Sequence, residues 1–138
     1  MVRGYAGAAL FIDYGYFPIA PGPTLGGFQR HQPVSIFDAP GTADLSAHVD
    51  FAAFAEVGRA AGGEIHGPVT QGRFLTELGV GLRLAALRAR ATPSQRQTLD
   101  SGVSRLLDPV EMGTLFKVIA LISPGLPPPP GFGAGYEG

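Results

Sequence analysis

The sequence contains no cysteine. This absence excludes disulfide bonds, thiolate nucleophiles and cysteine-ligated zinc, and it is compatible with a reducing, intracellular compartment. An excess of positive charge is also missing, because the formal net charge is -1 at pH 7. A chain without a basic field has no electrostatic support for binding a phosphate backbone or anionic lipid. We therefore expect no nucleic-acid partner.

Long apolar runs are scarce as well. The run that ends at Asp13 is too short for the core of a signal peptide or for a membrane span. We expect a cytoplasmic protein without membrane insertion. No serine stands in a Gly-x-Ser-x-Gly turn, so a small hydrolase has no support either.

The chain length of 138 residues is typical of one domain. Ala8 to Ile12 is a continuous apolar run between Gly7 and Asp13, a pattern typical of a strand buried on both faces of a parallel sheet. The remaining patterns predict, in order, a loop over 15–41, a helix over 51–61 with Asp50 as N-cap, a strand over 64–70, three helices over 71–78, 82–90 and 93–107, and a strand over 114–122. This order favours an α/β fold with a helical insertion before the last strand.

Two segments are rich in proline and glycine. The loop over 15–41 is long enough to be a lid or a substrate clamp, or it is an Ω-like loop attached by Phe28 and Phe37; the sequence leaves both readings open. The segment 123–138 contains four consecutive prolines and then many glycines, so it predicts polyproline II followed by flexible chain without packed structure.

Several short motifs, in a fixed order, resemble the MidA family of class I methyltransferases that use S-adenosyl-L-methionine. The motifs are Ala8–Tyr16, Thr24-Leu25, Arg30-His31, Pro40–Phe51, Gly67–Gly72, Phe74-Leu75, Leu78-Gly79, Arg105-Leu106 and Met112–Val118. Each motif is short, but their shared order covers roughly residues 8 to 132. The resemblance implies a Rossmann-like sheet closed by an antiparallel last strand, with 8–14, 64–70 and 114–122 as its fifth, sixth and seventh strands.

The resemblance also implies an activity, namely symmetric dimethylation of an arginine on a respiratory complex I subunit during assembly. Members of the family are mitochondrial in eukaryotes. The cofactor site of such folds is a glycine-rich turn that follows the first strand. Here Gly4 to Gly7 precedes a strand, so residues 1–122 are expected to be the C-terminal half of the domain, without the cofactor-binding half. The chain alone is expected to be inactive.

The candidate substrate-binding residues lie where strands are expected to end. Asp13, Tyr14 and Tyr16 follow the first strand, at the edge where open α/β sheets bind ligands, and aromatic rings beside a carboxylate suit an arginine side chain. The alternative is that Asp13 caps a turn at Gly15. No catalytic residue is assigned.

Three further candidates are His48, Gln71 and Arg73. His48 could pair with Asp50 in acid-base chemistry, or it could be a structural donor next to a helix cap. Gln71 and Arg73 could face an anion at a helix start, or they could cap that helix and form surface pairs. His48 and Asp50, with His31 in the preceding loop, could also suggest a metal site, but the resemblance implies no metal requirement and none is assigned. Lys117 is a lesser candidate for contact with substrate.

A second hypothesis is a non-enzymatic module that binds a partner protein or acts as an assembly factor. A strand of interior type at residues 8–12 lacks a neighbour before it in the chain, so the isolated chain is expected to aggregate or form homo-oligomers.

Overall fold

The computed structural model describes residues 6–18, 22–30, 32–38 and 40–133. Its central feature is a mixed sheet with the strand order β5-β1-β7-β6. The four strands are β1 (Ala8–Tyr16), β5 (Val49–Asp50), β6 (Glu64–Thr70) and β7 (Phe116–Ile122). β7 is antiparallel to both β1 and β6, so β1 and β6 run in the same direction. This is the expected α/β sheet with an antiparallel last strand.

One face of this sheet is covered by α1 (Phe51–Ala60). Asp50 is its N-cap as expected, because the Asp50 side chain accepts a hydrogen bond from the backbone N–H of Ala53 at 2.9 Å. Val57 of this helix points away from the sheet and is 69% exposed. Gly58 faces the sheet instead, and a Cβ there would lie 2.6 Å from Ile65. The missing side chain allows helix and strand to approach closely.

The opposite face of the sheet is covered by α2 (Gln71–Glu77) and by the C-terminal segment. Here the prediction of a tail without packed structure is wrong as far as Gly133. Phe132 is 8% exposed and its ring lies 5.4 Å from that of Phe74. The backbone N–H of Gly133 donates to Glu77 at 2.9 Å. One aromatic side chain thus anchors a proline-rich segment whose backbone has no regular structure of its own. The residues from 134 on lie outside the described residues.

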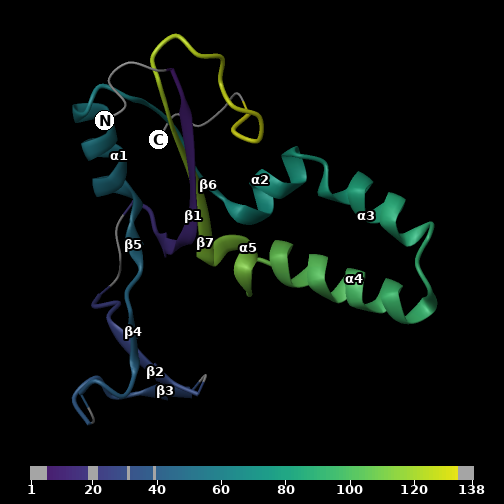
Figure 1. Cartoon of the computed structure of the whole chain (residues 1–138), viewed down its shortest axis with the longest axis horizontal. Helices are drawn as coiled ribbons and strands as arrows, with labels where there is room; N and C mark the ends of the chain where they lie inside the picture. Colours follow the sequence, from purple (N-terminus) through teal and green to yellow (C-terminus); the bar gives the residue numbers. More distant parts are fainter. Residues whose placement is uncertain (1–5, 19–21, 31, 39, 134–138) are drawn as a thin grey trace.

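The predicted helical insertion between the last two strands is confirmed. α2 is followed by α3 (Val80–Arg88), α4 (Pro93–Leu107) and the short α5 (Met112–Leu115). α4 starts with a capping box formed by Thr92 and Gln95, with Pro93 in the first turn. Because residues 112–115 are helical, β7 starts two residues later than expected. Figure 1 shows α3 and α4 as a hairpin that extends away from the sheet.

The segment expected to be a loop forms a second, three-stranded sheet with the order β3-β2-β4. Its strands are β2 (Gly26–Gln29), β3 (Gln32–Val34) and β4 (Asp44–Ser46), and Figure 1 shows this arm projecting from the carboxyl end of β1. The loop prediction missed these strands because each is only three or four residues long. Phe37 is 82% exposed and Phe28 is 43% exposed, so the expected attachment of a surface loop by these two rings is wrong. The arm stands out from the fold.

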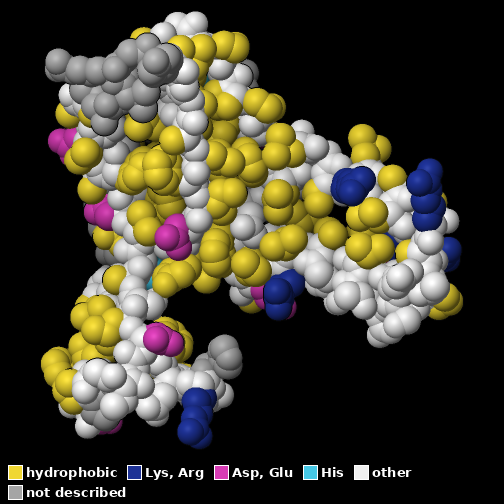
Figure 2. Space-filling view, in the orientation of Figure 1, with side chains coloured by type: hydrophobic (Ala, Val, Ile, Leu, Met, Phe, Trp, Pro, Cys, Tyr) yellow, Lys and Arg dark blue, Asp and Glu magenta, His cyan; other side chains and the backbone are white. Residues whose placement is uncertain are grey.

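β1 differs most from its expected burial. The sequence predicts a strand buried on both faces, whereas Ala8 to Asp13 are exposed. These residues are exposed because β1 has little cover along one of its edges. β7 lies along the other edge, whereas on this edge, among the described residues, β5 pairs only with Gly15 and Tyr16. Figure 2 shows hydrophobic side chains gathered over this region of the surface.

The packing of Phe132 gives a test of the C-terminal segment. Phe132→Ala should lower the free energy of unfolding by about 3 kcal/mol, because it removes a buried ring and leaves a cavity. The matched control Phe37→Ala removes an exposed ring and should change the free energy by less than about 0.5 kcal/mol. Urea unfolding followed by circular dichroism measures both. Equal effects would show that Phe132 is not part of the core.

Candidate functional site

The candidate residues gather at one edge of the main sheet. Since β1 and β6 run in the same direction, their carboxyl ends meet at this edge, where open α/β sheets bind ligands. Asp13, Tyr14 and Tyr16 end β1, and His48 directly precedes β5. The structure thus places these four residues at one edge of the sheet, where Tyr14 contacts His48 and Tyr16 contacts Asp50.

Tyr14 connects the sheet to the base of the arm. Its hydroxyl and the Ser46 hydroxyl form a hydrogen bond of 2.7 Å. Its ring makes edge-to-face contacts with His48, at a centroid distance of 5.6 Å, and with Phe116, at 5.7 Å. The backbone N–H of His48 donates to Thr24 at 3.2 Å, so both limbs of the arm are tied together here. Tyr14 therefore fixes the position of the arm and presents a half-buried aromatic surface at the same time.

Tyr16 and Asp50 form the second polar contact at this edge. Partial burial raises the pKa of Tyr16, and the negative charge of Asp50 and the hydrogen bond to it raise this pKa further. The phenol therefore stays protonated at neutral pH and donates to the carboxylate. Because Asp50 also caps α1, this pair joins the end of β1 to the start of that helix.

Asp13 and Lys117 are opposite each other in the β1–β7 ladder, and Lys117 is opposite Thr70 in the β7–β6 ladder. Directly opposed residues point to the same face of a sheet. The Asp13 carboxylate is exposed and accepts the backbone N–H of Tyr14 at 2.8 Å. Lys117 donates to the carbonyl of Thr114, and burial lowers its pKa.

Ser46 and Phe116 belong to this cluster, although sequence reasoning did not select them. Lys117 lies between Asp13 and Thr70 in the sheet, although the sequence gave it only a minor role. Its signal is that it is the single lysine of the chain, beside nine arginines. No sequence signal distinguishes Phe116 from an ordinary packed strand residue.

Gln71 and Arg73 lie at the same edge but are occupied by structural contacts. Gln71 is 7% exposed and its side chain donates to the carbonyl of Leu106 at 3.0 Å, which ties α2 to α4. Arg73 forms an ion pair of 2.7 Å with Glu77. The N-cap of α2 is Thr70, whose hydroxyl accepts the backbone N–H of Arg73. Arg73 thus forms the expected kind of surface pair, whereas the expectation that Gln71 and Arg73 cap the helix is wrong, because Thr70 is the cap.

No group of three or more His, Asp or Glu side chains that could hold a metal ion occurs within 6–18, 22–30, 32–38 and 40–133. No helix in the described part of the chain is long and apolar enough to cross a membrane.

The glycine that follows the core of β1 is not open to a ligand. A Cβ at Gly15 would lie 2.3 Å from the carbonyl oxygen of Val49 and 2.6 Å from the ring of Phe51. The backbone of Val49 and the ring of Phe51 therefore fill the space beside Gly15, so this position requires glycine.

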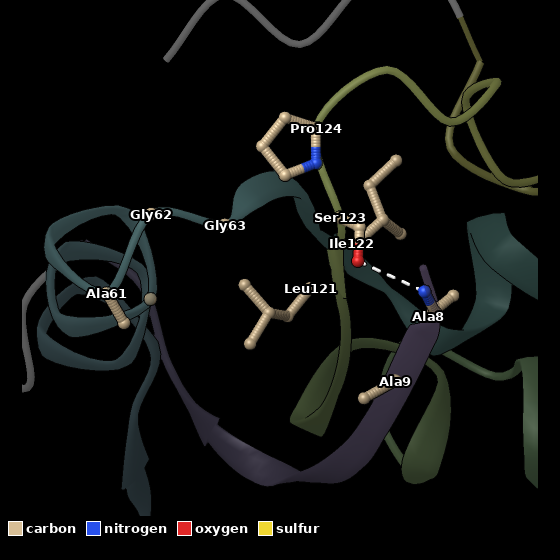
Figure 3. A pocket seen from close by; sticks show the side chains of 11 residues that line it. Ala8, Ala9, Ala61, Gly62, Gly63, Leu121, Ile122, Ser123 and Pro124 are labelled. Atoms are coloured by element: carbon tan, nitrogen blue, oxygen red, sulfur yellow. Dashed lines mark hydrogen bonds between the residues drawn. The ribbon is translucent and has the colours of Figure 1, made fainter. Parts of the chain in front are cut away.

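A cavity of about 280 Å³ lies at the other end of the sheet. Small residues from the end of α1 and the start of β1 line it, and Figure 3 shows Leu121 projecting into it. The Ser123 hydroxyl accepts the backbone N–H of Gly7 at 3.0 Å at its margin. This apolar cavity lies at the end of the sheet opposite to Tyr14 and His48.

Comparison with known proteins decides the family. A family model described as putative S-adenosyl-L-methionine-dependent methyltransferase matches residues 1–69, half of the chain. The chain belongs to this methyltransferase family. S-adenosyl-L-methionine is the cofactor of the family.

Curated relatives extend the match over most of the chain. The Drosophila melanogaster protein arginine methyltransferase NDUFAF7 homolog, mitochondrial, is 38% identical over 122 residues, which are 87% of this chain and 27% of that protein. The human protein arginine methyltransferase NDUFAF7, mitochondrial, is 40% identical over 119 residues, 84% of this chain and 26% of that protein. The chain thus spans about a quarter of the length of these relatives.

Solved structures confirm the fold class. A Burkholderia thailandensis protein bound to S-adenosyl-homocysteine has a TM-score of 0.76 and 37% sequence identity, and the match covers 93% of this chain and 34% of that chain. A second, native crystal structure from the same organism has a TM-score of 0.77 and 37% sequence identity, and the match covers 94% of this chain and 36% of that chain. The expected Rossmann-like methyltransferase sheet is therefore correct.

Gly15→Ala tests the close contact between β1 and β5. The added methyl group would collide with Val49 and Phe51, so we expect a loss of about 2 kcal/mol or more in the free energy of unfolding. Gly102→Ala is the control, because a Cβ at that position in α4 has nothing within 4 Å, and it should stabilise by about 0.5–1 kcal/mol. Thermal unfolding distinguishes the two. A neutral Gly15→Ala variant would mean that this edge has room for a ligand.

The ion pair between Arg73 and Glu77 should shift the pKa of Glu77, and this shift can be measured. The hydrogen bond from Arg73, helped by its charge and by the Gly133 N–H, lowers the pKa of Glu77 below the ordinary 4.5, against a smaller opposing effect of burial. The ion pair therefore contributes its full stabilisation at pH values above the ordinary pKa of 4.5. This stabilisation is lost as the pH falls through the lowered pKa of Glu77. In an NMR titration, Arg73→Ala should raise the pKa of Glu77, whereas Arg88→Ala, on α3, should not. An unchanged pKa in Arg73→Ala would contradict the ion pair.

Proposed function

We propose that this chain supplies the substrate side of an S-adenosyl-L-methionine-dependent protein arginine methyltransferase. In this proposal residues 1–122 are the C-terminal half of a class I methyltransferase domain, and 123–138 form a tail that the domain holds through Phe132. The observation that carries the proposal is the cluster of carboxylates and aromatic rings at the carboxyl edge of β1. The names of the curated relatives support arginine as the residue modified.

The chemistry of a guanidinium group matches this cluster. An arginine side chain keeps its charge at neutral pH and binds carboxylates in its own plane and aromatic rings on its faces. Asp13 is an exposed carboxylate at the end of β1, and the rings of Tyr14 and His48 lie at the same strand end, with Tyr14 on the opposite face of the sheet from Asp13. Asp50 is the second carboxylate, and the raised pKa of Tyr16 keeps the phenol available as its donor. These groups could bind the substrate arginine and orient one of its nitrogens.

Methyl transfer itself needs a second component. The bound cofactor of the family supplies the methyl group. We therefore propose that the 138-residue chain alone is inactive and that the remaining part of the domain provides the cofactor site.

The proposed substrate is a protein, specifically a subunit of respiratory complex I that is symmetrically dimethylated on arginine. The support is the resemblance of the sequence and the description of the relatives as protein arginine methyltransferases of mitochondria. A bacterial member would act on the cytoplasmic side, where a complex I subunit is assembled. The alternative of a non-enzymatic assembly module shares the protein partner but needs no cofactor.

Titration calorimetry separates these functions. The purified chain should show no saturable binding of S-adenosyl-L-methionine. A domain completed with the remaining part of the Burkholderia thailandensis relative should bind it. Binding near one per chain by the short chain would overturn the proposed division of the domain, and no binding by either protein would favour the non-enzymatic module.

Substitutions in the completed domain test the substrate side. Asp13→Asn removes the exposed negative charge and should lower kcat/KM for an arginine peptide by about tenfold or more, the cost of about one lost charged hydrogen bond. Glu111→Gln, an exposed charge removed at the start of α5, is the control and should leave kcat/KM unchanged. Transfer of labelled methyl groups measures both. Equal rates for wild type and Asp13→Asn would exclude Asp13 from substrate binding.

A further inference from the structure

The α3–α4 hairpin carries the unbalanced positive charge of the chain. Residues 80–107 contain five of the ten basic residues, all arginine, and one acidic residue, so their formal net charge is +4. The rest of the chain has five basic and ten acidic residues, a formal net charge of -5. Figure 2 shows dark blue side chains gathered toward the outer end of the hairpin. A chain that is nearly neutral overall thus has one strongly basic projection.

The hairpin has no role in the hydrophobic core. The structure describes all of residues 80–107, and neither α3 nor α4 contributes a buried residue. Gln71 ties the base of the hairpin to the fold through the carbonyl of Leu106. Like charges gathered on one projection repel each other and lower its stability. The charge of the hairpin therefore points to a partner rather than to the stability of this chain.

Three arginines meet where α3 ends and α4 begins, in residues 88–96, which we call the hairpin tip. Arg96 reaches the end of α3, where its Nε donates to the carbonyl of Arg88 at 3.0 Å. Arg88 forms an ion pair with Asp100, the single acidic residue of the hairpin. The third arginine of the tip is Arg90. These contacts fix the shape of the tip, and they neutralise only one of its three charges.

Two arginine side chains of the hairpin are free to bind a partner. Within the described part of the chain, the side chains of Arg83 and Arg90 form no hydrogen bond or ion pair. The backbone N–H of Arg90 donates to Leu87 at 3.2 Å, so the helical turn continues to this residue. Arg83 and Arg90 are seven positions apart, close to two turns, and therefore lie on the same side of α3. Both are exposed.

A carboxylate is the anion that this surface fits. A guanidinium group binds a carboxylate through two parallel hydrogen bonds, and several arginines at fixed positions select a segment with several acidic side chains. An anionic membrane is a poorer match, because membrane-binding segments use roughly four to eight basic residues together with aromatic anchors, and residues 80–107 contain no aromatic residue. A second copy of the chain also fits less well, since two tips related by a two-fold axis would bring like charges together.

We propose that the hairpin tip and Arg83 bind an acidic segment of the substrate protein, separate from the segment that carries the target arginine. This inference rests on the proposed function and deepens it, because it adds a second recognition element for the same substrate. The two elements have opposite charge. Asp13 and Asp50 attract the target arginine, whereas the arginines of the hairpin attract acidic residues elsewhere in the substrate. Complementary charges at two places fix the orientation in which a partner binds.

The hairpin sets the distance between these two segments. α4 has 15 residues, so it spans about 22 Å from the tip to its last residue, Leu107. α5 follows and leads into Phe116, whose ring lies 5.7 Å from that of Tyr14. The base of the hairpin is therefore beside the proposed arginine site, and its tip is remote from that site. An extended peptide needs about seven residues or more to span this length.

The first experiment measures the fluorescence anisotropy of a labelled oligoglutamate peptide with the 138-residue chain. We expect saturable binding, whereas an oligoglutamine peptide of the same length should not bind. The affinity should fall steeply as the ionic strength rises from about 0.01 M to about 0.15 M, because the Debye length shortens from about 30 Å to about 8 Å. The double variant Arg83→Gln/Arg90→Gln should weaken binding by about tenfold, the effect of two lost exposed charge pairs.

The matched control is the double variant Arg30→Gln/Arg59→Gln. It changes the net charge by the same amount, but Arg30 lies in the arm and Arg59 on α1, and both are exposed. At an ionic strength of about 0.15 M its affinity for oligoglutamate should stay within about twofold of wild type, since charges far beyond a Debye length are screened. Circular dichroism checks that both double variants keep the helix content of the wild type.

The second experiment measures methyl transfer by the completed domain. Two peptides carry the same target arginine and the same acidic segment, separated by about three residues in one and by about ten in the other. Both are made with the acidic segment before and after the arginine. The longer spacing, in one of the two orders, should give a kcat/KM about tenfold higher, because only that peptide reaches both sites. Arg83→Gln/Arg90→Gln should abolish this difference, mainly through KM, and Arg30→Gln/Arg59→Gln should preserve it.

Each outcome decides the proposal. Equal affinity for oligoglutamate in wild type and Arg83→Gln/Arg90→Gln would overturn it, as would tighter binding to phosphatidylserine vesicles than to the peptide. Dimers that the same double variant dissociates would assign the tip to self-association instead. In an active domain, a kcat/KM that does not depend on spacing would also overturn the proposal. If the completed domain methylates no arginine peptide but the tip still binds oligoglutamate, the proposed function fails and the docking of an acidic segment is retained.

Discussion

Both hydrophobic cores of the main sheet depend on β7. Its residues Val118, Ile119, Ala120 and Ile122 are at most 3% exposed, and they alternate between the two faces of the sheet. Ile119 belongs to the core beneath α1, whereas Val118, Ala120 and Ile122 belong to the core beneath α2 and Phe132. β7 also pairs with a strand on each edge, so it satisfies its backbone groups while it separates the two cores. β7, which lies near the end of the chain, thus joins β1 and β6, which precede it.

The same arrangement explains where polar side chains gather. With β7 antiparallel between β1 and β6, the carboxyl ends of those two strands lie at one edge. Tyr14 then holds the arm to this edge through Ser46 and His48. Asp50 connects Tyr16 to the start of α1. The proposed substrate cluster is therefore built by contacts that also fix the arm and the helix.

Much of the main sheet and its helices could be predicted from the sequence because these elements have strong local signals. Asp50 and Thr92 are N-caps at the starts of α1 and α4. The arm could not be predicted, because three or four residues per strand give no periodicity. Nor could the anchoring of Phe132, since its partners Phe74 and His66 lie more than fifty residues earlier.

The candidate site was likewise predictable from the sequence only in part. The sequence alone determined that Asp13, Tyr14 and Tyr16 follow a strand, because an apolar run and its polar end are contiguous in the chain. Only the tertiary structure decided that His48, Phe116 and Lys117 join them and that Gln71 and Arg73 are occupied elsewhere, because strand order and register depend on contacts between distant segments. The sequence determined that β1 has the side chains of an interior strand. The tertiary structure decided that one edge of β1 has no partner in the described chain, since pairing depends on which strands are present to meet it.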